Sequence, residues 1–165
     1  MSTKSNVVPI HQTTERESEK KWGRSVVTAG YAIVPSLIFK AQARLGLSCT
    51  QLALLLHLVD YWWHSAKLPY PSKKTLAERM HLGERQVQRY LTELENAGFI
   101  RRIERFAGHK GQQSNMYDLK GLVDKLKKLE PEFRQVREEA EINAREVTRP
   151  GGLTRFKKET EREQK

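Results

Sequence analysis

The sequence predicts a mainly α-helical fold with a small β-hairpin, followed by a C-terminal helical extension. Three observations predict it. Between residues 71 and 100, apolar residues recur at helical spacing on both sides of a short turn at Leu82-Gly83. Glycines and β-prone residues after position 98 are typical of a hairpin. From position 120 onward, the chain is highly charged and keeps a regular apolar spacing.

Composition limits the classes of function. The chain has 165 residues with 30 basic and 20 acidic side chains, so its net charge is +10. This balance favours a polyanionic partner, nucleic acid before membrane. Cys49 is the only cysteine, and no metal-binding set or catalytic arrangement is recognisable. We therefore expect no enzyme activity, no cofactor, no metal and no membrane contact, and a cytoplasmic location.

The chain divides into four segments by composition. Residues 1–28 are polar, and we expect a disordered N-terminal arm. Residues 29–119 hold the apolar residues of a folded domain. Residues 120–147 form the charged helical extension. Residues 148–165 open with a Pro-Gly-Gly break, and we expect a disordered tail.

Two helices are expected before the central stretch. Pro35 suits the first turn of a short helix, because its missing N–H is not needed there. Ser48 and Gln51 have the spacing of a capping box, which predicts a second helix from Ser48 to His64. That helix is apolar over most of its circumference, as a core helix is.

The stretch from Pro71 to Ile100 predicts two helices joined by a tight turn. Ser72 is a suitable N-cap for the first helix. Ala77 is small enough to let the two helices approach each other. Gly83 can cap the second helix, and Gly98 ends it, because glycine adopts the left-handed conformation at little cost.

The second of these helices, residues 84–97, has two distinct faces. One side is apolar and carries Val87, Tyr90, Leu91, Leu94 and Ala97. The other side carries Arg85, Gln88, Arg89, Thr92 and Asn96. Arginine pairs with guanine and glutamine with adenine in the DNA major groove. A solvated surface helix is the alternative, but the spacing, the turn and Gly98 together favour DNA binding.

The residues after Gly98 predict a hairpin whose loop spans 107–114. Apolar Phe99, Ile100 and Ile103 are interleaved with arginines, and two glycines lie in the loop. A basic loop beside a DNA-reading helix can reach phosphates or the minor groove, although a solvated turn is the alternative. The predicted DNA-contacting residues are Ser72, Lys73, Lys74, Arg85, Gln86, Gln88, Arg89, Arg102, Arg105, His109, Lys110 and Gln112.

The run LAERMHLGERQVQRYLTELENAGFI resembles the winged helix-turn-helix family of bacterial, plasmid and phage regulators and replication-initiator-like proteins. The family pattern is LAerlgvSrrTvqRaLreLeeaGlI, and the resemblance spans roughly residues 30–119. His81 stands where the family usually has glycine. Gly83 stands where it usually has serine or threonine. The resemblance implies DNA binding by a helix-turn-helix with the hairpin as its wing.

The C-terminal extension shows alternating spacings of four and three, typical of a coiled-coil seam. A dimerisation helix and a helix packed on its own domain are both consistent with it. Pro131 predicts a break, with one helix ending at Leu129 and a second starting near the proline. The predicted dimerisation residues are Leu122, Leu126, Leu129, Phe133, Val136 and Ala140, and Asn143 continues the spacing as its one polar member.

The leading functional hypothesis is a sequence-specific double-stranded DNA-binding protein that regulates transcription. The recognition helix 84–97 would enter the major groove, and the wing would contact the backbone. One alternative is a plasmid or phage replication initiator that binds repeated origin sites. Another is a protein-interaction adaptor without DNA binding. The expected partners are double-stranded DNA, a second copy of the chain, and transcription or replication machinery contacted through the C-terminal segment.

Overall fold

The computed structural model describes residues 17–106 and 112–151, and the chain divides into two units, Met1–Ile33 and Val34–Lys165. The first unit contains α1 (Glu17–Trp22) and α2 (Arg24–Thr28). The prediction of a disordered arm is therefore wrong for residues 17–28, and residues 1–16 lie outside the described part. Local contacts support these helices. The Lys20 ammonium lies 2.7 Å from the Glu17 carboxylate, and the Thr28 hydroxyl donates to the Arg24 carbonyl at 2.8 Å.

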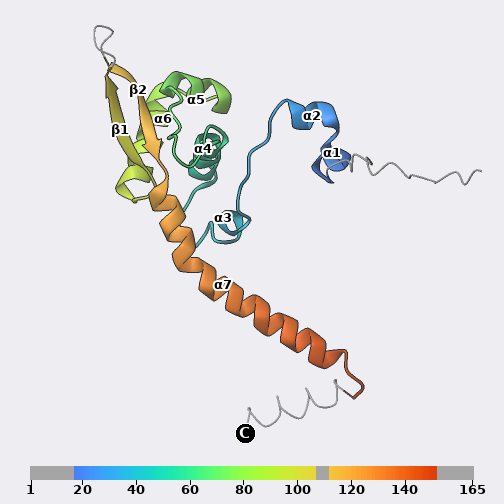
Figure 1. Ribbon diagram of the computed structural model, residues 1–165. Helices are drawn as coiled ribbons and strands as arrows, with labels where there is room; N and C mark the ends of the chain where they lie inside the picture. The colour runs from blue at the N-terminus through green and yellow to red at the C-terminus, as the bar shows by residue number, and fades with distance from the viewer. Residues whose placement is uncertain (1–16, 107–111, 152–165) are drawn as a thin grey trace, which may run out of the picture. The chain divides into compact units, whose positions relative to one another are not determined.

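The second unit is mainly helical with one antiparallel hairpin, which confirms the predicted fold class (Figure 1). A long helix follows the hairpin directly. No helix in the described ranges is both long and apolar enough to span a bilayer. The elements are α3 (Leu37–Lys40), α4 (Cys49–Asp60), α5 (Lys73–Met80), α6 (Glu84–Asn96), β1 (Arg101–Phe106), β2 (Gln112–Asp118) and α7 (Lys120–Val147).

Helix α4 begins with the capping box that the sequence predicts. The Ser48 hydroxyl accepts the Gln51 N–H at 3.2 Å, and the Gln51 side-chain oxygen accepts the Ser48 N–H at 3.0 Å. The helix ends at Asp60, four residues before the predicted His64. Beyond the end of the helix, Trp63 and His64 are exposed, whereas Trp62 is half-buried and packs against the core.

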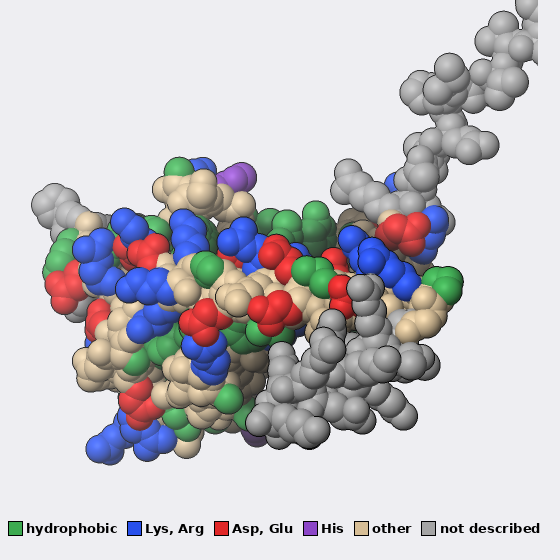
Figure 2. All heavy atoms as spheres, turned by 90° about the horizontal axis from the view of Figure 1, so that it is seen from below, with side chains coloured by type: hydrophobic (Ala, Val, Ile, Leu, Met, Phe, Trp, Pro, Cys, Tyr) green, Lys and Arg blue, Asp and Glu red, His purple; other side chains and the backbone are tan. Residues whose placement is uncertain are grey.

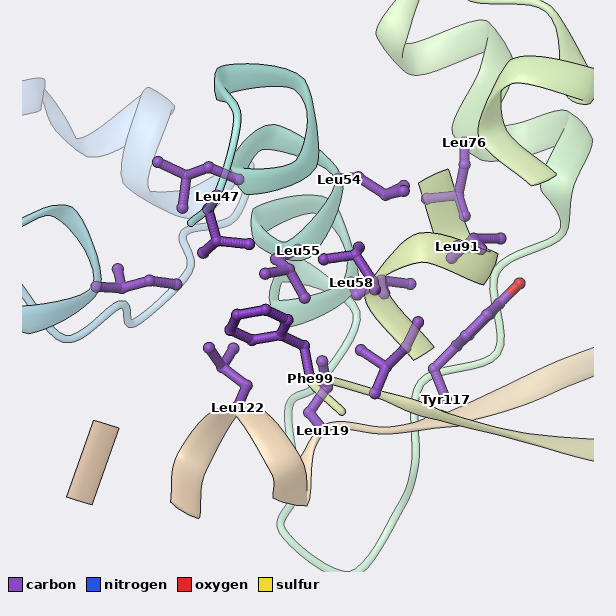
Figure 3. Packing of buried hydrophobic residues seen from close by; sticks show 14 of the residues in the cluster. Leu47, Leu54, Leu55, Leu58, Leu76, Leu91, Phe99, Tyr117, Leu119 and Leu122 are labelled. Carbon is purple, nitrogen blue, oxygen red and sulfur yellow. The ribbon is translucent and has the colours of Figure 1, made fainter. Parts of the chain in front are cut away.

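The hydrophobic core lies where α4, α5, α6, the hairpin and the start of α7 meet. Figure 3 shows the leucines of α4 pointing toward Leu76, Leu91 and Phe99. Leu54, Leu55 and Leu58 are fully buried. Helices α3 to α7 and strand β2 therefore all contribute to one core, and this fixes α6 and the hairpin against a common support.

The turn between α5 and α6 contains one residue in the left-handed backbone conformation. The Ser72 hydroxyl caps α5 by accepting the Thr75 N–H at 3.0 Å. Helix α5 ends at Met80, and the next residue, His81, has a φ of 53°, which explains why glycine suits this position. The Leu82 N–H then donates to the Ala77 carbonyl at 2.9 Å, and Ala77 is buried. The chain thus turns tightly enough to start α6 at once.

The hairpin is antiparallel and pairs Arg102 with Tyr117. The Tyr117 N–H also donates to the Pro69 carbonyl at 2.9 Å, which ties the hairpin to the segment before α5. Strand β2 begins at Gln112. The predicted loop 107–114 is therefore too long at its C-terminal end, because residues 112–114 continue the ladder.

Helix α7 runs without interruption through Pro131, so the predicted break there is wrong. Proline removes one N–H donor, which leaves the Lys127 carbonyl without its usual helical partner. Lys127 is exposed, so water can satisfy that carbonyl. The helix is also held on both sides of the proline, by buried Leu126 before it and by a paired Arg44–Glu132 contact after it, at 2.8 and 3.3 Å.

The apolar stripe of α7 changes its environment along the helix. Leu122 and Leu126 are buried in the core of their own domain, and Leu129 and Phe133 are half-buried. Val136 and Ala140 are exposed. The first two predicted dimerisation residues are thus used within the chain, so the prediction of a dimer seam remains for the residues beyond them.

Candidate nucleic-acid interface

Helix α6 has the two faces that the sequence predicts. Val87, Leu91 and Leu94 are fully buried against the core. Arg85, Gln86 and Arg89 are exposed, and Gln88 is half-buried. The core therefore fixes the rotation of the helix and leaves basic and amide side chains on the opposite face.

Some outward side chains of α6 have local partners. The Gln86 side-chain oxygen accepts the Gly83 N–H at 3.0 Å, so this residue helps to start the helix. The Gln88 amide lies 3.4 Å from the Thr92 hydroxyl. The Arg89 guanidinium lies 3.7 Å from the Glu93 carboxylate and 5.1 Å from the centroid of the Tyr90 ring. These contacts are surface contacts that a ligand can replace, since exposed ion pairs contribute little.

The N-terminus of α5 adds two cations beside α6. Lys73 and Lys74 lie in the first turn of α5, and both are exposed. Helix N-termini favour anions, because unpaired N–H groups and the helix dipole point there. The Ser72 hydroxyl is already used in capping, so the lysines are the more available groups.

A groove lies between α5, α6 and β2 and encloses about 320 Å³. Three cationic side chains and one carboxylate line it, from Lys73, Lys74, Arg102 and Glu84. The polar residues Gln113–Asn115 of β2 complete the wall, and none of the three is among the DNA-contacting residues predicted from the sequence. The sequence feature that could have indicated these residues is a short polar run next to the predicted hairpin loop.

The ion pair between Glu95 and Arg102 joins the end of α6 to the start of β1. Glu95 accepts the backbone N–H of Arg102 at 2.8 Å and its Nε at 2.6 Å, and Nη2 of the same guanidinium also contacts the carboxylate. Burial acts to raise the pKa of Glu95, but the hydrogen bonds and charge of Arg102 outweigh it and leave the pKa lowered. Arg102 thus holds the hairpin on the helix, besides lining the groove.

The remaining predicted contacts lie on the hairpin. The Arg105 guanidinium lies 4.5 Å from the centroid of the Tyr70 ring, an arrangement that holds the side chain beside the hairpin. Phe106, the last residue of β1, is 70% exposed. His109 and Lys110 lie outside the described residues, as does the side chain of Gln112.

Charge is mixed on the face of the molecule shown in Figure 2. Basic and acidic side chains alternate there without an extended basic patch. The net charge of +10 therefore does not by itself locate a ligand surface. The groove beside α6 is the place where cations, amides and a helix N-terminus coincide.

Comparison with known proteins identifies the central segment. Residues 45–100 match the family described as "Helix-turn-helix domain". This range spans α4, α5 and α6 and ends just before β1. Residues 45–100 form a helix-turn-helix domain. Within it α5 and α6 are the two helices of the motif, and the hairpin that follows occupies the position of a wing.

No curated protein matches this chain. Among solved structures, the chain is similar to the N-terminal domain of the DnaD protein from Geobacillus kaustophilus HTA426. The two share 26% sequence identity with a TM-score of 0.48, over 71% of this chain and 93% of that one.

Proposed function

We propose that the protein binds double-stranded DNA in a sequence-specific manner through α6 and acts as a transcriptional regulator. The observation that carries the proposal is the orientation of α6 in its helix-turn-helix domain. Buried Val87, Leu91 and Leu94 hold one face of the helix in place, so the opposite face presents arginine and glutamine side chains in a fixed array.

In this proposal α6 reads bases in the major groove. Arg85 and Arg89 supply bidentate donors suited to guanine, and Gln88 supplies a donor and an acceptor suited to adenine. The ion pair of Arg89 with Glu93 opens on binding. Its cost is small because both side chains are exposed, 61% and 43%.

The groove between α5, α6 and β2 binds the DNA backbone. Lys73 and Lys74 stand at a helix N-terminus, where phosphate is favoured electrostatically. Gln113–Asn115 add hydroxyl and amide groups that can hydrogen-bond phosphate oxygens. Contacts of this kind set the position of the protein on the duplex, and the side chains of α6 then supply base preference.

The experiment is a selection of bound genomic and plasmid DNA fragments by the purified chain near physiological salt. A single inverted repeat that overlaps a promoter is expected for a transcriptional regulator. A cluster of direct repeats near an origin would instead indicate replication initiation. No enrichment, together with no retention of bulk DNA at low salt, would show that the domain is a protein-interaction scaffold and would contradict the proposal.

A further inference from the structure

The distal part of α7 leaves the core of its own domain. From Glu130 to Val147 its residues are exposed, except for half-buried Phe133. Ion pairs within the helix lie beside the apolar stripe, with Arg134 at 3.8 Å from Glu130 and Arg137 at 3.9 Å from Glu141. The apolar stripe meanwhile continues, and Val136 is 66% exposed.

A groove runs beside this stripe, and its lining combines apolar side chains with the charged residues Lys40, Glu130, Arg134 and Arg137. Leu37 of α3 lies on one side of it, and Phe133, Val136 and Ala140 of α7 line the other. The groove encloses about 430 Å³. Arg44 fixes its geometry, since the guanidinium is 2.8 Å from the Glu132 carboxylate and 5.9 Å from the centroid of the Phe133 ring. Phe133, Val136 and Ala140 thus belong both to the sequence spacing and to the lining of the groove.

The geometry points to a second copy of α7 as the occupant. We propose that residues 129–147 pair with the same segment of a second chain as a parallel, in-register coiled coil. The spacing of Leu129, Phe133, Val136 and Ala140 follows a heptad repeat, which matches a helix of identical spacing. Asn143 and Val147 continue it to the end of α7, and the in-register arrangement pairs Asn143 with its counterpart.

The charges beside the stripe select the parallel orientation. Glu132, Glu139 and Glu146 occupy one flank, and Glu130, Arg137 and Ala144 occupy the other. In a parallel pair each flank faces the opposite flank of the partner helix, so Glu132 of each chain meets Arg137 of the other. In an antiparallel pair each flank faces its own kind, which would bring glutamates against glutamates. Glu132 can accept from Arg44 and from the second copy together, because a carboxylate has several acceptor sites.

The start of α7 is joined rigidly to the helix-turn-helix domain. The Leu122 N–H donates to the Phe99 carbonyl at 2.8 Å. A Cβ at Gly121 would collide with the Gly98 carbonyl oxygen, so only glycine permits this approach. A dimer through residues 129–147 would therefore relate two α6 helices by a two-fold axis and favour inverted-repeat DNA. That consequence rests on the proposed function, whereas the dimer itself does not.

The first experiment is sedimentation of the full chain without DNA, with two matched variants. Val136→Glu places a charge in the stripe, and Ile142→Glu places the same charge outside it. Ile142 is a fitting control, because it is 55% exposed on the same helix and glutamate favours helix at both positions. We expect a dimer for the wild type and Ile142→Glu, and a monomer for Val136→Glu with unchanged helix content. A monomeric wild type, or a dimeric Val136→Glu, would overturn the proposal.

The second experiment tests the orientation by cross-linking. Cys49 is a free, exposed thiol, so a Cys49→Ser background removes it. Ala140→Cys in that background should form a disulfide-linked dimer under mild oxidation, since position 140 faces its counterpart only in a parallel register. Ile142→Cys should cross-link much less. Equal cross-linking at both positions, or none at 140, would contradict the arrangement. Neither readout involves DNA, so failure here is distinguishable from failure of the proposed function.

Discussion

Helix α6 and the distal part of α7 carry similar sequence patterns but differ in what covers them. Both have an apolar stripe and an opposite polar face. In α6 the stripe residues Val87, Leu91 and Leu94 are fully buried in the core of the domain. In α7 full burial ends after Leu126, Leu129 and Phe133 are half-buried, and Val136 is exposed. An apolar stripe covered within the chain fixes the helix and leaves its polar face for a ligand. An uncovered stripe is itself a surface for a partner.

The largest expected effect is a loss of folding stability on substitution of a core residue of α6. Leu91→Ala should lower the free energy of unfolding by about 2–5 kcal/mol, because Leu91 is fully buried in α6. Val136→Ala should change it by less than about 0.5 kcal/mol at dilute concentration, because Val136 is exposed. Chemical denaturation of both variants measures the difference. Similar losses for the two would show that distal α7 is covered within the monomer.

A smaller effect is expected where α6 meets the hairpin. Glu95→Gln should destabilise the protein by about 1–3 kcal/mol at neutral pH, because it leaves the Arg102 guanidinium partly buried without its charged partner. The pKa of Glu95 is lowered in the folded state, so its contribution is present above the unfolded pKa and is lost as the pH falls through the folded one. Denaturation at a series of pH values checks this. The wild-type and variant curves should converge in acid, and a constant gap at every pH would contradict the ion-pair account.

An effect of similar size concerns DNA binding alone. Arg89→Ala should weaken specific DNA binding by about 1–3 kcal/mol and leave folding stability unchanged, because Arg89 is exposed on α6. Arg145→Ala, an exposed arginine on distal α7, is the matched control and should retain the affinity of the wild type. Fluorescence anisotropy at fixed salt measures both. Equal affinity for the two variants would remove Arg89 from the interface.

Local chemistry explains which features the sequence predicts well. The capping box at Ser48 and the cap at Ser72 follow from side chains that bond to neighbouring amides. The buried face of α6 follows from apolar spacing, and the hairpin follows from the residues after Gly98. These features depend on residues within a few positions of each other, so a single sequence contains the information.

Features that depend on contacts between residues far apart in the chain were either not predicted from the sequence or predicted wrongly. Pro131 indicated a break, but Arg44, far away in the chain, holds the helix beyond the proline through Glu132. The ion pair of Glu95 with Arg102, and the wall of Gln113–Asn115, depend on how the hairpin folds back toward α6. Apolar spacing predicted the stripe of α7. Spacing alone does not indicate which residues of that stripe are buried against other elements of the same chain.

The central claim is that the outward face of α6 reads base sequence. The most direct measurement is selection from a random double-stranded DNA pool, with the wild type and with a Gln88→Ala/Arg89→Ala variant in parallel. The account predicts that the wild type enriches a common motif. It predicts that the variant still retains bulk DNA at low salt but loses the base preference. Enrichment of the same motif by both proteins would contradict the claim, because the preference would then arise outside these side chains.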